Sequence, residues 1–296
     1  MSANISTLRN TLAYELLRAF GLPKNAWLQS TFRWLFHGLI EQFAQGGLTF
    51  DQTVAAHGLQ PAAAWLLTRF CTRFTACGLE TIPETGPLLV VSNHPGSIDI
   101  LLILASLHRL DVKLISNDIP FLQSLPAASA HLIYGARTVD IQKRMASLRA
   151  GIRHLQAGGT LILMGTGHID PDPEVHPEAA QSLERWSPSM EIILKQVPET
   201  RLLVTIVSGV LSARWACHPI TWLRKEPRRK RLLAEIGQLT EQAFFPRLRY
   251  LYPHITFAPP ICLPELQLES HSASVLPAII SRAKTLLVEH MEKILC

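Results

Sequence analysis

The sequence predicts an α/β protein with a mostly parallel sheet flanked by helices, preceded by a helical N-terminal region. From residue 88 onward, apolar runs of four to seven residues alternate with segments of helical character, which is typical of parallel strands buried on both faces. Residues 1–80 lack such runs, and their apolar residues recur at helical spacing instead. We therefore expect a helical N-terminal region over 1–80 and an α/β domain over 81–296.

Two helices are expected in the N-terminal region. Segment 25–44 has apolar residues at a helical period. Pro61 lies in the first turn of the second helix, which Gly78 ends. This second helix combines aromatic side chains with Arg69 and Arg73, a mixture that suits either a helix at a membrane interface or, more commonly, a helix packed on its own domain.

The α/β domain is expected to alternate strands and helices. Strands are predicted at 88–92, 112–116, 160–164, 201–207 and 254–257. Helices are predicted at 98–108, 140–156, 178–197, 227–243 and 274–295. Asp140 can cap the second of these helices, and Gly158 and Gly159 end it. In sheets of this kind, active sites gather at the carboxyl ends of the strands.

The apolar content bears on where the protein resides. The 296 residues are 48% hydrophobic and only 17% charged. Even so, the longest apolar runs fall well short of the ~20 residues of a membrane-spanning helix. The N-terminus carries dispersed charges and no signal-peptide core. We expect a cytoplasmic protein, either free or resting on the inner face of a membrane.

The charge balance and the cysteines bear on its partners. The net charge of +5 favours an anionic partner, such as a phosphate-bearing substrate, an acidic carrier protein or an anionic bilayer. Nucleic acid is disfavoured because no recognised binding motif is present. The five cysteines are scattered without a Cys-x2-Cys pair, which argues against a disulfide framework and a zinc site.

The segment LLVVSNHPGSID, residues 88–99, is the most informative about chemistry. His94 follows a predicted strand, and Asp99 falls in the first turn of the next predicted helix. A carboxylate there can fix the imidazole tautomer and raise its basicity, leaving the other ring nitrogen to remove a proton from a substrate. The alternative is that Asp99 only favours the helix start and that His94 is an ordinary loop residue.

The stretch LVVSNHPGSIDILLI resembles the Asn-His-x4-Asp block of the glycerolipid acyltransferase superfamily, which includes the glycerol-3-phosphate and lysophosphatidate acyltransferases. Three stretches that resemble the family's further blocks follow in the family's order: HLIYGARTVD, LILMGTGHIDPDP and LLVTIVSGVL. The resemblance covers about residues 80–215. It implies the glycerol-3-phosphate acyltransferase-like fold.

The resemblance also implies an activity. A fatty acyl group would move from acyl-CoA or acyl carrier protein to a hydroxyl of a glycerol-phosphate or lysophospholipid-like acceptor, with His94 as general base and Asp99 as its partner. Arg137 would bind the acceptor phosphate; otherwise it is a solvated arginine that pairs with Asp140. No metal or organic cofactor is implied. The other residues expected to bind substrate are Asn93, Gly96, Ser97, Thr166, Gly167 and His168, with the Gly96–Ser97 turn as the source of amide donors for the oxyanion.

The third and fourth blocks depart from the family pattern. Met164, Gly165 and Thr166 stand where the family has Phe, Pro and Glu, and the fourth block lacks its proline. Thr166 can make a hydrogen bond but carries no charge. Either the acceptor differs from glycerol phosphate, which we favour, or the site tolerates a neutral hydroxyl. Two other classes stay open: a thioesterase or lipid hydrolase that uses the same pair, and a catalytically altered peripheral lipid-binding protein.

Two charged segments have a structural and a functional interpretation. In 168–176, His, Asp and Glu recur at every second position, as they would in an extended metal-binding segment; the intervening prolines favour a plain extended loop. The run 224–231 carries six positive charges beside Trp222 and Leu223. It is either a solvated helix start or a binding surface for anionic headgroups or an acidic acyl carrier.

Overall fold

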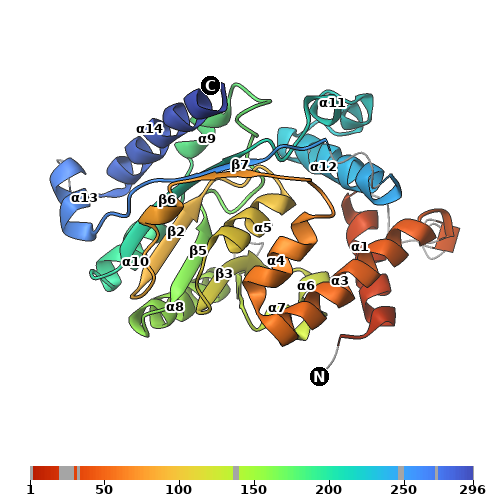
Figure 1. Ribbon diagram of the computed structural model, residues 1–296, viewed down its shortest axis with the longest axis horizontal. Coiled ribbons are helices and arrows are strands. Elements are labelled where there is room, and N and C mark those ends of the chain that lie inside the picture. The colour runs from red at the N-terminus through yellow and green to blue at the C-terminus, as the bar shows by residue number, and fades with distance from the viewer. Residues whose placement is uncertain are drawn as a thin grey trace.

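The computed structural model describes residues 3–19, 30–31, 34–135, 140–245, 250–270 and 273–295. Within these residues a seven-stranded sheet forms the centre, with the strand order β1-β7-β6-β2-β5-β3-β4 (Figure 1). The strands are β1 (Thr75–Cys77), β2 (Leu88–Ser92), β3 (Val112–Asn117), β4 (Leu132–Gly135), β5 (Thr160–Met164), β6 (Arg201–Ser208) and β7 (His254–Phe257).

Neighbouring strands of this sheet are parallel except for β6 and β7, which pair antiparallel. The predicted fold class, a mostly parallel sheet flanked by helices, is therefore confirmed. β2 occupies the middle of the sheet between β5 and β6, and all five of its residues are buried. The chain that leaves its carboxyl end is held on both sides by neighbouring strands.

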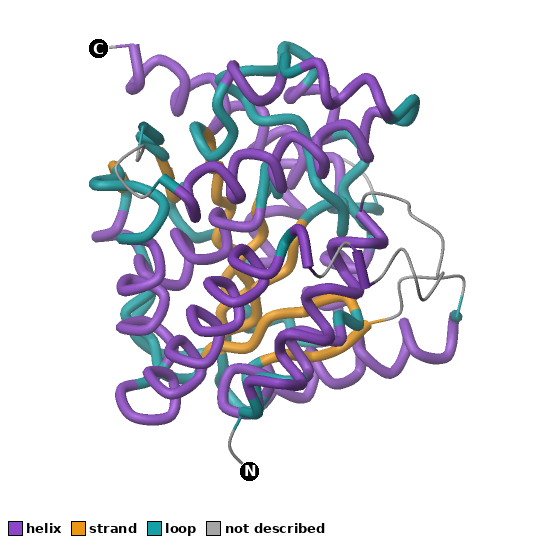
Figure 2. Tube along the Cα trace, turned by 90° about the vertical axis from the view of Figure 1, so that its right-hand side faces the viewer, coloured by secondary structure: helices purple, strands orange, loops and turns teal. Residues whose placement is uncertain are grey.

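Both faces of the sheet are covered, because successive strand residues point in opposite directions. In β2, Leu89 and Val91 belong to one core cluster, and Leu88 and Val90 belong to another. The first cluster packs under α8 (Ile141–Gln156), α9 (Ala179–Leu183), α10 (Ser189–Gln196), α13 (Leu263–Ser270) and α14 (Leu276–Leu295). The second packs under α4 (Leu59–Leu67) and α5 (Ser97–Ser106). Figure 2 shows the strands enclosed between helices.

The N-terminal helices form a third core beside the sheet. α1 (Ile5–Ala19), α3 (His37–His57) and α4 pack with two short helices, α6 (Pro120–Gln123) and α7 (Pro126–Ser129). Asp51 on α3 accepts a hydrogen bond from the Ala128 amide at 2.9 Å, which ties α3 to α7. The domain boundary near residue 80 stays a prediction.

Two expected helices differ in the structure. The helix that starts near Pro61 ends at Leu67 rather than at Gly78, because residues 75–77 form β1 and pair with β7. Segment 178–197 contains the two helices α9 and α10 rather than one, and Pro188 precedes the second. Proline lacks the amide that a helix interior requires, so a single continuous helix was the wrong prediction.

The remaining predicted elements are found close to their expected bounds. The expected helices correspond to α5, α8, α12 (Pro227–Phe244) and α14, and the Asp140 side chain caps α8 by accepting from the Lys143 amide at 3.0 Å. The expected helix over 25–44 falls partly outside the described residues, and α3 begins at His37. No helix among the described residues has the length and apolar character needed to cross a bilayer.

Candidate active site

His94 lies where β2 ends and the chain turns into α5. Ser92 is the last residue of β2, and Ser97 is the first of α5. Between them, the Asn93 side chain donates to the Val207 carbonyl and accepts from the Val207 amide, both at 2.8 Å. Asn93 is 2% exposed, and its amide group is fully used in joining β2 to β6. The backbone that carries His94 is thereby fixed at the carboxyl edge of the sheet.

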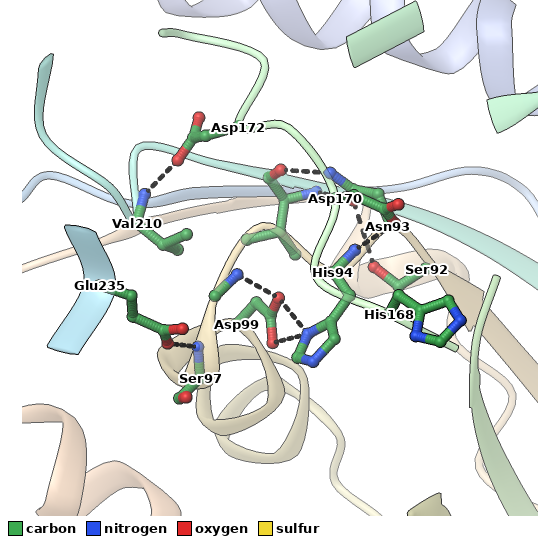
Figure 3. Close-up of polar contacts among 12 residues, drawn as sticks. Ser92, Asn93, His94, Ser97, Asp99, His168, Asp170, Asp172, Val210 and Glu235 are labelled. Atoms are coloured by element: carbon green, nitrogen blue, oxygen red, sulfur yellow. Dashed lines mark hydrogen bonds and ion pairs between the residues drawn. The ribbon is translucent and has the colours of Figure 1, made fainter. Parts of the chain in front are cut away.

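The imidazole of His94 is held by Asp99 (Figure 3). Nδ1 lies 2.8 Å from Asp99 Oδ2 and 3.1 Å from Oδ1, and the Asp99 side chain is fully buried. A carboxylate only accepts, so Nδ1 donates its proton to Asp99, and Nε2 has a free lone pair once the ring is neutral. The His94 side chain is 19% exposed, and its Nε2 has no hydrogen-bond partner within the described residues. The predicted pair is therefore formed, with the second ring nitrogen available to a substrate.

Several charges determine the proton affinity of this imidazole. Burial lowers the pKa of His94, but the charge and hydrogen bond of Asp99 and the charges of Glu235 and Asp170 raise it to about 9. The protonated ring is thus the stable form at neutral pH. Such a group holds a proton firmly once it has taken one, and it acts as a base only after losing the proton that it already holds.

The loop after β5 is hydrogen-bonded to the backbone of His94. Asp170 Oδ2 accepts from the His94 amide at 3.0 Å, and the Asp170 amide donates to the His94 carbonyl at 2.6 Å. Thr166 Oγ1 lies 2.8 Å from Asp170 Oδ1. Burial raises the pKa of Asp170 to about 6 against the opposing effect of these bonds. Thr166, which stands where the block that this stretch resembles has a glutamate, therefore orients the Asp170 carboxylate.

Gly165 stands where the family block that this stretch resembles has proline, and its packing gives a reason for the difference. Its amide donates to the Ser92 carbonyl at 2.8 Å, which joins the end of β5 to the end of β2. A β-carbon at this position would overlap the indole ring of Trp186. Proline has neither the amide nor the space, so the Pro of the family pattern does not fit this packing.

The second aspartate of the acidic loop 168–176 accepts hydrogen bonds from backbone amides. Asp172 is fully buried and accepts from the amides of Gly209, Val210 and Leu211 at 2.8 to 3.1 Å. It thereby fixes the turn that follows β6. Among the residues that the structure describes, no three His, Cys, Asp or Glu side chains gather in a metal-binding arrangement.

The turn at Gly96 and Ser97 already has carboxylate partners. The Gly96 amide donates to Asp99 Oδ2 at 3.1 Å, and the Ser97 amide donates to Glu235 Oε1. A β-carbon on Gly96 would lie 3.2 Å from the same Glu235 oxygen, so the glycine permits this close approach. Neither amide is free for an oxyanion in this arrangement. The expectation that this turn supplies free donors is therefore wrong for this arrangement.

Glu235 lies at the site although the sequence analysis did not predict it. It lies on α12, is 5% exposed, and its Oε2 has no partner among the described residues. Burial raises its pKa. Arg231, Glu235, Gln238 and Gln242 recur at helical spacing, and all are buried. By spacing alone this polar stripe resembles a solvent-facing surface, yet it packs against other parts of the chain; Gln238, for example, accepts from the Ser212 amide at 2.8 Å.

Gly167 and His168 are exposed on the loop after β5. Figure 3 places His168 on the side of the His94 ring that faces away from Asp99. Burial, then the positive charges of Arg228 and His94, lower the pKa of His168. The exposed side of His94 is therefore bordered by a second imidazole that favours its neutral form.

Arg137, the residue expected to bind an acceptor phosphate, lies outside the described residues. Its role stays a prediction.

Comparison with known proteins gives a similarity in structure. No family model matches the chain, and no curated protein matches it. Among solved structures, the chain is similar to the crystal structure of the 1-acyl-sn-glycerophosphate (LPA) acyltransferase PlsC from Thermotoga maritima. The match covers 96% of this chain and 97% of that chain, at 15% sequence identity and a TM-score of 0.48.

Proposed function

We propose that this protein is an O-acyltransferase that moves a fatty acyl group from acyl-CoA or acyl carrier protein to a hydroxyl of a glycerol-phosphate or lysophospholipid-like acceptor. The observation that carries the proposal is the His94–Asp99 pair. The pair is joined at 2.8 Å, stands at the carboxyl edge of the sheet and leaves Nε2 without a partner among the described residues. The same two residues form the Asn-His-x4-Asp block.

The proposed reaction requires one base and no activated side-chain nucleophile. His94 Nε2 removes the proton of the acceptor hydroxyl while that oxygen attacks the carbonyl carbon of the thioester. The resulting tetrahedral intermediate collapses, the C–S bond breaks, and the imidazolium returns the proton to the thiolate. Asp99 stabilises the imidazolium between these two transfers. The products are an ester and a free thiol.

The surrounding residues support this chemistry by position. Asn93 and Asp170 hold the backbone of His94 and make no contact with substrate in this proposal. Gly167 and His168 border the acceptor, and Thr166 acts through Asp170. Arg137 remains the proposed anchor of an acceptor phosphate, on the resemblance alone.

We also propose that the protein works on an anionic membrane surface. Trp222 and Leu223 are 75% and 69% exposed and end a short 3-10 helix (Pro219–Leu223) that precedes the basic run 224–231. Exposed apolar side chains beside a basic cluster are the combination that binds anionic lipid headgroups. A long-chain acceptor would be presented to the site from such a surface.

The acceptor is identified by incubating the protein with radiolabelled acyl-CoA and a panel of acceptors. The panel contains glycerol 3-phosphate, lysophosphatidate, neutral lysophospholipids and glycerol without phosphate. The proposal predicts a labelled ester with at least one of them. Free fatty acid formed at the same rate without any acceptor would identify a hydrolase instead. Binding of acyl-CoA without any turnover would contradict both enzymatic interpretations.

A further inference from the structure

A pocket of about 220 Å³ lies between α12, the turn after β6 and the start of α9, and its lining includes His176, Lys230 and Arg231. We propose that this pocket binds a phosphate group of a substrate. These three residues lie outside the Asn-His-x4-Asp block and do not include Arg137.

Arg231 is the central observation. The residue is 8% exposed and lines the pocket. Nη2 donates to the Ile169 carbonyl at 3.4 Å, whereas Nε is buried without a partner among the described residues. A buried cation with an unused donor is costly unless an anion completes its hydrogen bonds. A guanidinium also matches the paired oxygens of a phosphate.

A second unpartnered polar atom and the charge balance agree with an anionic ligand. His176 also lines the pocket, and its Nδ1 is likewise buried without a partner within the described chain. Lys230 supplies another positive charge, and Glu178 is the acidic residue of the lining. Arg185 and Arg228, as well as the carboxylates of Asp170 and Glu178, lie close enough to affect Arg231 electrostatically. The positive charges named here still outnumber these two carboxylates.

The size of the pocket limits what it holds. Pockets for drug-sized ligands measure roughly 300–1,000 Å³, and this one is smaller. It has room for a phosphate group but none for a fatty acyl chain. A phosphate ester bound here would place its phosphate group in the pocket and its remaining parts outside it.

The pocket is linked to the catalytic pair through the backbone. Arg231 bonds the Ile169 carbonyl, and the next residue, Asp170, bonds both backbone groups of His94. A phosphate bound to Arg231 would thus be held at a fixed position relative to His94. The phosphate source is either the acceptor or the donor, since both a lysophosphatidate headgroup and coenzyme A carry phosphates. The assignment to a substrate rests on the proposed function, whereas phosphate binding itself does not.

Phosphate binding is tested first, without catalysis. Inorganic phosphate is titrated into the full-length protein by calorimetry, and the same titration is made with Arg231→Gln, Arg231→Lys and Lys230→Gln. Loss of one charge-assisted contact should weaken binding by roughly tenfold. We expect that loss for Arg231→Gln, a smaller one for Lys230→Gln, and partial recovery for Arg231→Lys. Phosphate binding as in the unmodified protein by a folded Arg231→Gln variant would overturn the proposal.

The matched control is Arg9→Gln on α1. Arg9 pairs with Glu41 at 2.6 Å, its side chain is 44% exposed, and it does not line the pocket. We expect unchanged phosphate affinity for this variant. Thermal unfolding of every variant separates loss of the pocket from loss of the fold. Lys230 is less buried than Arg231, so Lys230→Gln keeps the test valid if Arg231→Gln does not fold.

Steady-state kinetics then assigns the phosphate to its source. A KM for the phosphate-bearing acceptor that rises by roughly tenfold in Arg231→Gln, with the KM for acyl-CoA unchanged, identifies the acceptor phosphate. The reverse pattern identifies the donor. Unchanged values of both KM would overturn the role in substrate binding. A protein without acyltransferase activity that still loses phosphate binding on Arg231→Gln would refute only the proposed function.

Discussion

Three carboxylates surround the imidazole of His94 and decide when it can act as a base. Burial would lower its pKa, and Asp99, Glu235 and Asp170 raise the pKa to about 9 instead. A general base must be neutral, so kcat/KM for acyl transfer should rise with pH and reach half its maximum near pH 9. Measurement of kcat/KM between pH 6 and roughly 10 reports this ionisation in the free enzyme.

Glu235→Gln tests the contribution of the buried carboxylate on α12. Removal of a negative charge near His94 destabilises the imidazolium, which lowers the pKa of His94. The rising limb of the pH profile should therefore move to lower pH, while the glutamine oxygen still accepts from the Ser97 amide. The control is Glu199→Gln, an exposed residue away from the site, which should leave the profile in place. An unmoved limb in Glu235→Gln would show that this carboxylate does not affect the base.

The packing of the loop after β5 gives a physical reason why the stretch LILMGTGHIDPDP differs from the family block that it resembles. Gly165 bonds Ser92 and accommodates the indole of Trp186 against its α-carbon. Thr166 engages Asp170, which bonds the backbone of His94. Gly165 and Thr166 thus belong to one connected set of contacts around the end of β2. The carboxylate of this arrangement is that of Asp170, four residues after Thr166.

Gly165→Ala should destabilise the protein by about 2 kcal/mol, because the added methyl group overlaps Trp186 in a packed interior. For a chain of this size that corresponds to a melting temperature lower by about 3 °C. The matched control is Gly46→Ala on α3, where a β-carbon meets no atom within 4 Å. That variant should be neutral or slightly more stable. Thermal unfolding of both variants checks the prediction; equal melting temperatures for them would contradict the packing described for Gly165.

The strands predicted from apolar runs are found because the runs are largely buried; β2 and β5 are buried throughout, whereas β3 is buried at only two of its six positions. β1 and β4 were missed for a physical reason: they are the edge strands, at the two ends of the sheet order. β1 spans only three residues, and its partly exposed residues give no continuous apolar signal. Pairing with β7 determines its conformation, and local sequence patterns cannot reveal a partner 179 residues away.

Across the whole molecule, the site combines residues that are far apart in the sequence. The His94–Asp99 pair was predictable because both members lie within one turn. Glu235 and Arg231 were not, since their positions depend on how α12 packs at the carboxyl edge of the sheet. The buried polar stripe of α12 resembles a solvated face by spacing alone. Only the tertiary packing distinguishes the two.

Association with membranes is a property of the molecular surface and is tested with vesicles. Trp222→Ala combined with Leu223→Ala should weaken binding to anionic phosphatidylserine vesicles by at least about tenfold, since each apolar side chain contributes roughly 1.5–3 kcal/mol when fully buried. Added salt should weaken binding further by screening the basic run. The control is Leu268→Ala on α13, which is 78% exposed but away from basic residues 224–231. Equal loss in the control, or none in the double variant, would refute this surface.

The role of the His94–Asp99 pair is tested most directly by the acyl transfer activity of His94→Ala and Asp99→Asn, measured as labelled ester formed from radiolabelled acyl-CoA. We expect a fall of roughly 10²–10⁴-fold for His94→Ala, the usual contribution of a general base. Asp99→Asn should also lose activity, because an amide oxygen cannot stabilise the imidazolium as a carboxylate does. Both proteins should retain their folded state by circular dichroism. Ester formation by a folded His94→Ala variant at the rate of the unmodified protein would show that His94 is not the general base.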